Sequence, residues 1–205
     1  MLKIDNKKIV KPIQTHTDNV EVVTNTSEQF KEVDGLITNK ENITLSTSSA
    51  DCTSLLLYDP IKKVIGSIHS GWRGTLQRIG QKAVKKMIDE FGCNPEDIIC
   101  CICPHIRKCH FEVEDDVKEL FEKEFADICC KNDVIEKGEI INNAQKYYID
   151  TTLINKILLR KIGLKDENVI DSGICTVCNS DELHSYRSDR EKSGRNAAII
   201  TRMSI

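Results

Sequence analysis

Cys52 and His69 are the two side chains in the sequence best placed for chemistry. Each flanks a short apolar run, because Cys52 precedes residues 55–58 and His69 follows residues 64–68. Asp59-Pro60 lies between the two runs and favours a turn. Short apolar runs bounded by turn signals are typical of buried strands. If the two strands pair as a hairpin, we expect the thiol and the imidazole to be neighbours at one end of it.

A thiol beside an imidazole supports two kinds of chemistry. In the first, His69 deprotonates Cys52 and the thiolate attacks a carbonyl group, as in the hydrolysis of an amide bond. In the second, both are ligands of a metal ion, with His16 as the third. A thiolate and neutral imidazoles are good zinc ligands, and three protein ligands with one open position are typical of catalytic zinc. The spacing matches no local zinc finger, so purely structural roles for these residues also stay open.

The chain has ten cysteines, which is a high count for 205 residues. Its start lacks the apolar stretch of a secretory signal, so the count indicates free thiols or metal ligands and not a disulfide framework. Many cysteines lie in apolar runs such as residues 98–102, where we expect small buried side chains. The pairs Cys100-x-x-Cys103 and Cys175-x-x-Cys178 have the spacing of metal ligands, which leaves a structural metal as an alternative.

Length and charge restrict the classes of function. With 205 residues the chain is expected to form one domain over residues 1–205. Lysine and arginine number 29 against 32 acidic residues, giving a formal charge of −3, so nothing in the charge favours nucleic acid or an anionic membrane as partner. No window is long and apolar enough to span a bilayer. We therefore expect a cytoplasmic protein.

The elements that position these residues follow from hydrophobic periodicity. Apolar residues at helical spacing predict a helix from Thr75, as N-cap, to Phe91, with Gly92 ending it. Two more helices are predicted at 114–125 and, after the N-cap Asp150, at 151–162, while 130–148 is expected to be loop with short strands. Further strands are predicted at 33–38, 43–48, 98–102 and 197–200, and from 169–170 onward to 174–178. This alternation predicts an α/β or α+β domain with mixed sheets.

A series of short motifs resembles the bacterial laccase-domain family, also called YfiH-type purine nucleoside phosphorylases or polyphenol oxidases. The motifs occur in the same order over nearly the whole chain. They are Gln14-Thr15-His16, Asp34-Gly35-Leu36-Ile37-Thr38, Ala50-Asp51-Cys52, His69-Ser70-Gly71-Trp72-Arg73-Gly74, Cys109-His110-Phe111-Glu112-Val113, Cys175-Thr176, Ser185-Tyr186-Arg187 and Ser193-Gly194-Arg195.

The resemblance implies an α/β/β/α sandwich and an enzyme acting on purine nucleosides. The implied activities are phosphorolysis of adenosine, inosine, guanosine and methylthioadenosine, and deamination of adenosine. The matching motifs imply that His16, Cys52 and His69 bind zinc, with copper as the alternative metal. Nucleoside and phosphate are then the expected partners of a monomer or homodimer. Zinc lowers the pKa of bound water, which suits hydrolytic deamination.

Other residues in the matching motifs are candidates for the substrate site. Arg73, Arg187 and Arg195, with Gln14, are expected to bind phosphate, because a guanidinium group binds oxygens with two parallel hydrogen bonds. An ordinary structural role is the alternative for each arginine. Asp51 is interpreted as a general base, as a residue that orients a ligand, or as a turn cap beside Cys52. Trp72 either stacks on a purine or packs beneath its turn.

Three departures from the family and three rival functions complete the expectations. The chain starts closer to the Gln-x-His motif than family members usually do, so we expect an N-terminal strand segment of the family to be missing. Cys103 stands where the family often has glycine, and Ser188 where a second arginine often follows Arg187.

The rival functions are a copper-dependent polyphenol oxidase, a metal-free Cys/His amide hydrolase and a non-enzymatic metal-binding protein.

Overall fold

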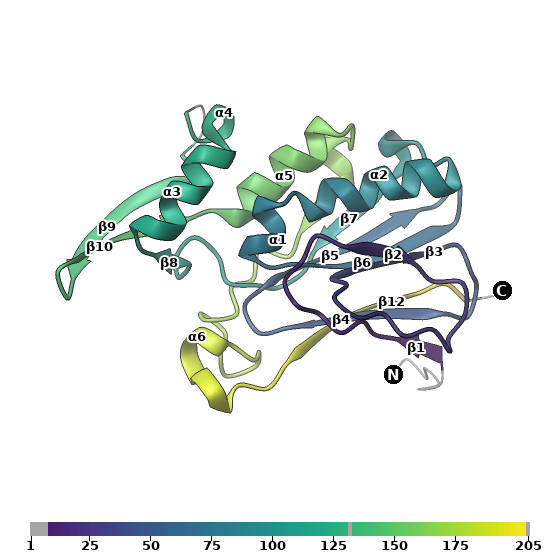
Figure 1. Cartoon of the computed structure of the whole chain (residues 1–205), viewed down its shortest axis with the longest axis horizontal. Helices are drawn as coiled ribbons and strands as arrows, with labels where there is room; N and C mark the ends of the chain where they lie inside the picture. Colours follow the sequence, from purple (N-terminus) through teal and green to yellow (C-terminus); the bar gives the residue numbers. More distant parts are fainter. Residues whose placement is uncertain (1–7, 131–132, 204–205) are drawn as a thin grey trace.

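Two β-sheets and a layer of helices form the centre of the molecule (Figure 1). The computed structural model describes residues 8–130 and 133–203. The larger sheet has six strands in the order β11-β7-β5-β6-β3-β2. Its strands are β2 (Val20–Val22), β3 (Gly35–Thr38), β5 (Thr53–Asp59), β6 (Val64–Ser70), β7 (Ile99–Ile102) and β11 (Val169–Asp171).

A smaller sheet packs against one face of the large one. Its strands are β1 (Ile9–Val10), β4 (Thr44–Ser49) and β12 (Asn196–Thr201), in the order β1-β4-β12. Both sheets are mixed, since each contains parallel and antiparallel pairs. Apolar side chains from both sheets, including Leu36, Leu45 and Ile65, form one buried cluster.

Helices cover the other face of the six-stranded sheet (Figure 1). Ile79, Ala83 and Met87 recur at helical spacing and are fully buried against the strands, with Leu55 and Leu57 opposite. The α-helices of the described residues are α1 (Trp72–Leu76), α2 (Ile79–Phe91), α3 (Asp115–Glu124), α4 (Ala126–Cys129), α5 (Thr151–Lys161) and α6 (Tyr186–Asp189). Short 3₁₀ turns occur at Pro95–Asp97, Asp166–Asn168 and Arg190–Lys192. None of the helices within the described ranges is long and apolar enough to cross a membrane.

A third sheet projects from this body together with α3 (Figure 1). It consists of β8 (Glu112–Val113), β10 (Ala144–Ile149) and β9 (Ile135–Ile141), all antiparallel. The sequence predicted loop with short strands over residues 130–148, whereas most of this segment forms two longer paired strands. A hairpin forms because Asn142 and Asn143 both adopt the left-handed backbone that a tight hairpin turn needs.

The α/β class with mixed sheets and most of the predicted elements are confirmed. Gly92 ends α2 with a φ of 63°, and the Asp150 carboxylate accepts the Leu153 N–H at the start of α5. The predicted single helix over 75–91 was wrong at its start, because Arg78 at φ 62° separates α1 from α2. The strand expected at 174–178 is reduced to one bridge between Cys175 and His105.

Candidate active site

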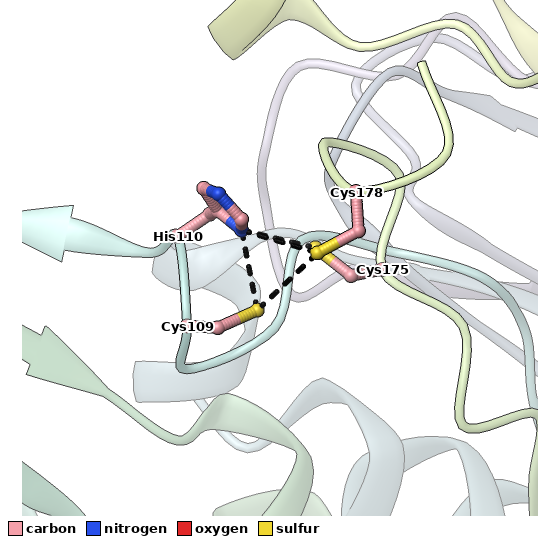
Figure 2. Close-up of side chains that lie close together, drawn as sticks. All are labelled: Cys109, His110, Cys175 and Cys178. Carbon is pink, nitrogen blue, oxygen red and sulfur yellow. Dashed lines mark hydrogen bonds between the residues drawn. The ribbon is translucent and has the colours of Figure 1, made fainter. Parts of the chain in front are cut away.

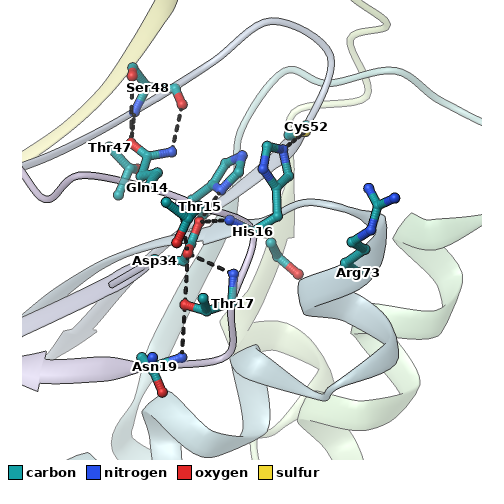
Figure 3. A network of polar contacts seen from close by, with 12 residues as sticks. Gln14, Thr15, His16, Thr17, Asn19, Asp34, Thr47, Ser48, Cys52 and Arg73 are labelled. Carbon is teal, nitrogen blue, oxygen red and sulfur yellow. Dashed lines mark hydrogen bonds and ion pairs between the residues drawn. The ribbon is translucent and has the colours of Figure 1, made fainter. Parts of the chain in front are cut away.

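The β5–β6 hairpin forms as predicted and places Cys52 next to His69. In its antiparallel register Thr53 pairs with Ser70 and Ser54 pairs with His69, so Cys52 lies at the open end of the hairpin. The loop before β2 brings His16 to the same point, with its Nε2 atom 3.9 Å from the Cys52 sulfur (Figure 3). The candidate ligand atoms of these three residues lie within 4.8 Å of one another. We call His16, Cys52 and His69 the pocket cluster.

Asp34 holds two members of the pocket cluster in place. Its fully buried carboxylate accepts the His69 Nδ1–H at 2.7 Å. It also accepts the backbone N–H groups of Thr15, His16 and Thr17 (Figure 3). These bonds support His16 in a left-handed conformation with φ 63°. Because Nδ1 of His69 is bonded to Asp34, Nε2 is the ring nitrogen that is left for Cys52 or for a metal ion. A carboxylate behind a histidine is the usual arrangement for a metal ligand.

The charges of the cluster favour a thiolate at Cys52. Burial raises the pKa of Cys52, but the two imidazoles outweigh burial and lower it to about 7. Burial also lowers the pKa of His69, yet the hydrogen bond to Asp34 and the neighbouring thiolate raise it to about 9. Asp34 is itself kept ionised, because hydrogen bonds from His69 and Thr17 overcome burial and lower its pKa to about 2. The site therefore stabilises the anionic sulfur that binds a metal or attacks an electrophile.

The backbone passes unusually close to the pocket cluster at Gly71. A Cβ atom there would lie 3.0 Å from His16 Cδ2 and 3.2 Å from the Cys52 sulfur. With a φ of −61°, Gly71 has a backbone that any residue adopts, so the constraint is purely one of space. Glycine at this position leaves room beside the thiol and the two imidazoles.

The pocket cluster lies in the wall of a cavity of about 580 Å³. The cavity is large enough for a nucleoside-sized ligand. Its lining combines apolar and polar groups: Ile106, Phe111, Trp72 and Tyr186, with Lys11, Gln14, Asp51, Thr151, Arg187 and Arg195 among the polar ones. This mixture can hold an apolar ring and fix polar substituents around it.

Gln14 and Asp51 hold neighbouring segments together. The Gln14 side chain donates to the Ser48 carbonyl and accepts the Ser48 N–H, both at 2.8 Å, as a neighbouring strand would (Figure 3). Asp51, at φ 83°, accepts the Thr176 hydroxyl at 2.7 Å and the Arg187 N–H at 2.6 Å. Both carboxylate oxygens of Asp51 are therefore engaged, which favours a positioning role over that of a general base.

The three arginines proposed for phosphate occupy different surroundings. The guanidinium of Arg187 donates to the backbone carbonyls of His110 and Glu112, both at 3.0 Å. Arg195 is exposed, donates to the nearby carbonyls of Ser193 and Gly194, and lines the cavity. The Arg73 guanidinium stacks on Trp72, 4.0 Å from the ring centroid, and Arg73 is not among the cavity-lining residues. Trp72 packs on the core beside α3 and also lines the cavity, so its two interpretations are compatible.

Asp34 and Lys11 are the residues of this site that sequence reasoning missed. Asp34 was noted only as part of a motif at the start of a predicted strand. Its role depends on the β3–β6 register, in which Gly35 pairs with Ile68 and Asp34 comes to lie beside His69. Lys11 lines the cavity from the segment between β1 and β2, and nothing in its sequence surroundings marks it.

The donor set of the pocket cluster fits a zinc ion. One sulfur and two imidazole nitrogens, held within 4.8 Å of one another and backed by a buried carboxylate, match the ligand types of catalytic zinc sites. The cluster has no fourth side-chain ligand among the described residues, and it faces the cavity. A bound ion would thus keep one position for substrate or water.

Comparisons with known proteins show the family to which the chain belongs. Residues 1–203 match the family described as multi-copper polyphenol oxidoreductase laccase. The chain is 31% identical over 211 residues to purine nucleoside phosphorylase YlmD of Bacillus subtilis (strain 168), with 98% of this chain and 73% of the relative covered. It is 30% identical over 213 residues to adenosine deaminase RL5 from an unknown prokaryotic organism, covering 98% and 78%. The crystal structure of Bacillus licheniformis hypothetical protein YfiH superposes with a TM-score of 0.87 at 29% identity, covering 98% and 76%.

Proposed function

The chain belongs to the multi-copper polyphenol oxidoreductase laccase family, and on that premise we propose that it is a zinc-dependent enzyme that phosphorolyses purine nucleosides and deaminates adenosine. The observation that carries this proposal is the convergence of the pocket cluster at the wall of a nucleoside-sized cavity. The names of the two relatives supply the two reactions. Adenosine, inosine, guanosine and methylthioadenosine are the proposed phosphorolysis substrates.

His16, Cys52 and His69 would hold the zinc ion, which supplies a Lewis acid and acidifies a water molecule at this corner of the cavity. Asp34 fixes the tautomer and orientation of His69, and its bonds to the backbone at residues 15–17 keep His16 directed at Cys52. Gly71 leaves the space these three side chains need. The protein thereby builds the ligand set before any ligand binds, which avoids the cost of reorganisation.

Phosphorolysis requires a phosphate held beside the sugar C1′ atom. The bond from C1′ to the purine nitrogen breaks, a phosphate oxygen bonds to C1′, and free base and ribose 1-phosphate result. Arg195 and Lys11 line the cavity and carry the positive charge that suits phosphate. Arg187 and Asp51 are better suited to positioning, because their polar groups are bonded to the protein. Arg73 lies outside the lining and is the weakest of the proposed phosphate ligands.

The cavity also offers surfaces for the nucleoside. Phe111, Ile106 and Tyr186 provide apolar contacts, and Trp72 provides an aromatic ring. An apolar cavity with a few convergent polar groups is typical of sites for small organic ligands. Deamination at the same site replaces the adenosine amino group by oxygen from water, releasing ammonia and forming inosine.

Product analysis tests this proposal. Zinc-loaded protein is incubated with adenosine, with and without inorganic phosphate, and the products are separated by chromatography. We expect adenine and ribose 1-phosphate only when phosphate is present, and inosine in both cases. The His16→Ala substitution should abolish both phosphorolysis and deamination. Absence of all three products would overturn the proposal, and oxygen uptake with a phenol by the copper-loaded protein alone would support the oxidase instead.

A further inference from the structure

Four potential metal ligands meet on the surface beside the cavity. Cys109 and His110 are adjacent in the chain, and the turn 175–178 brings Cys175 and Cys178 against them (Figure 2). We call these four residues the loop cluster. Their ligand atoms all lie within 4.8 Å of one another. The sequence left open a metal held by Cys100 and Cys103 together with Cys175 and Cys178, but Cys100 and Cys103 do not belong to this cluster.

The position of Cys100 explains the correction. Cys100 lies in β7 and its side chain is fully buried in the core beneath α2, where it packs among apolar residues. Cys103, just after the same strand, belongs to neither group of potential metal ligands among the described residues. Cys100 and Cys103 therefore lie in a strand and directly after it. Cys175 and Cys178 lie in a turn, and this turn directs both of their sulfurs to the same side.

The distances within the loop cluster match those of tetrahedral zinc. Bond lengths of about 2.3 Å for zinc–sulfur and about 2.0 Å for zinc–nitrogen, at tetrahedral angles, separate two sulfurs by about 3.8 Å and a sulfur from a nitrogen by about 3.5 Å. The Cys109 and Cys178 sulfurs are 3.9 Å apart. The His110 Nδ1 atom lies 3.2 Å, 3.7 Å and 3.5 Å from the sulfurs of Cys109, Cys175 and Cys178.

From this geometry we propose that Cys109, His110, Cys175 and Cys178 bind a structural zinc ion. Three thiolates and one imidazole form a closed set of ligands, which is the pattern of structural zinc and leaves no position for a substrate. Soft sulfur ligands also discriminate against magnesium, calcium and manganese. The proposal does not depend on the activity of the cavity, since it uses none of the pocket cluster.

The surroundings of Cys175 favour an anionic sulfur. The backbone N–H groups of Arg107, Cys178 and Val177 are directed at its sulfur. Amide hydrogens directed at a sulfur stabilise a thiolate, and the same orientation holds a metal ligand in place. This local feature agrees with the geometry on which the proposal stands.

The proposed ion would brace the cavity wall from outside. It would join the loop 103–111 to the turn 175–178, which otherwise meet through the bridge between His105 and Cys175. Both segments reach the cavity: the His110 carbonyl holds the Arg187 guanidinium, and the Thr176 hydroxyl holds Asp51. Loss of the ion should therefore destabilise the protein and loosen this wall.

The test uses the full chain with the pocket cluster disabled, so that only the loop cluster binds metal. We expect Cys52→Ser protein to retain about one zinc per chain, and Cys52→Ser/Cys178→Ser protein to retain about none. Cys52→Ser/Cys130→Ser is the matched control, because Cys130 is also exposed and lies outside both clusters. It should retain its zinc.

Two further measurements keep the proposal falsifiable if a double variant fails to fold. X-ray absorption of zinc in the Cys52→Ser protein should give three sulfur ligands and one nitrogen ligand. Thiol alkylation should modify Cys109 and Cys178 only after a chelator is added, with a fall in the melting temperature. Three results would overturn the proposal. The Cys52→Ser protein could remain free of metal after zinc loading, its zinc could have a shell of oxygen ligands, or the purified protein could contain a disulfide between Cys109 and Cys178.

Discussion

The pocket cluster and the loop cluster use the same ligand types but differ in how the fold builds them. Cys52 and His69 lie at the ends of paired strands, and Asp34, directly before the neighbouring strand β3, holds His69. The loop cluster joins two irregular segments and has no such carboxylate bonded to His110 in the hydrogen bonds of the described residues. The pocket cluster thus has three ligands supported by the sheet, whereas the loop cluster has four ligands that join two irregular segments.

The difference in coordination predicts a difference in role. Three ligands facing a cavity of about 580 Å³ suit chemistry on a bound molecule. Four ligands on the outer surface suit stabilisation, because no position is left for substrate. Substitutions in the two clusters should therefore separate activity from stability.

The largest effect is expected for Cys52→Ser. Loss of the thiolate removes a direct zinc ligand from the cavity, and even residues behind metal ligands typically contribute 10–100-fold, so turnover of adenosine should fall by more than about 100-fold. The melting temperature should change little, because the loop cluster is intact. Activity assays and thermal unfolding check this, and an active Cys52→Ser enzyme would contradict a catalytic pocket cluster.

Asp34→Asn should have the next largest effect. The amide cannot accept all the bonds that the carboxylate accepts, and the His69 tautomer is no longer fixed, so zinc affinity in the cavity should fall by about 10–100-fold. Zinc titration against a competing chelator measures this. Asp59→Asn is the matched control, because Asp59 is equally buried at the other end of the hairpin and accepts two turn N–H groups. It should lower stability without changing zinc affinity.

Arg195→Ala should affect substrate binding without affecting metal. We expect the KM for phosphate to rise by about 10-fold, since a charged hydrogen bond to an anion is lost, while zinc content stays unchanged. Arg190→Ala is the control, because Arg190 is exposed nearby but does not line the cavity. Equal KM values for Arg195→Ala and wild type would remove Arg195 from the phosphate site.

The smallest effect concerns the ion pairs beside the loop cluster. Asp171 accepts hydrogen bonds from Arg107 and Lys156, and although burial opposes them, these bonds hold its pKa below the ordinary 3.8. A depressed carboxyl pKa stabilises the fold above about pH 4, and that contribution is lost as pH falls further. Asp171→Asn should thus lower the free energy of unfolding by about 1–2 kcal/mol at neutral pH and by less at about pH 3.

Urea unfolding with a chelator present at both pH values measures the Asp171→Asn effect without a contribution from metal release. An equal loss of stability at neutral and acid pH would show that Asp171 acts through packing and not through its charge.

The two clusters differ in how well the sequence predicts them, because one depends partly on a local hairpin and the other on contacts between distant segments. Cys52 and His69 could be placed together because a hairpin fixes which residues are opposite once the turn at Asp59-Pro60 is located. Asp34 could not, because its contact with His69 depends on the long-range β3–β6 pairing, which local periodicity does not reveal. The break at Arg78 was equally hidden, since Leu76 and Ile79 fit one helical pattern.

The loop cluster was harder still to predict. The spacing Cys175-x-x-Cys178 indicates a pair of metal ligands. Which other residues lie beside this pair depends on the path of the loop 103–111 in the folded protein. The adjacent Cys109 and His110 carry no spacing signal of their own.

Anomalous X-ray diffraction at the zinc edge, from crystals of the zinc-loaded protein, tests the contrast between an open and a closed site most directly. We expect one zinc held by His16, Cys52 and His69 with a non-protein fourth ligand facing the cavity, and a second zinc held by four side chains of the loop cluster. A cavity without zinc, or a cavity zinc whose fourth ligand is a protein side chain, would contradict the proposed catalytic role.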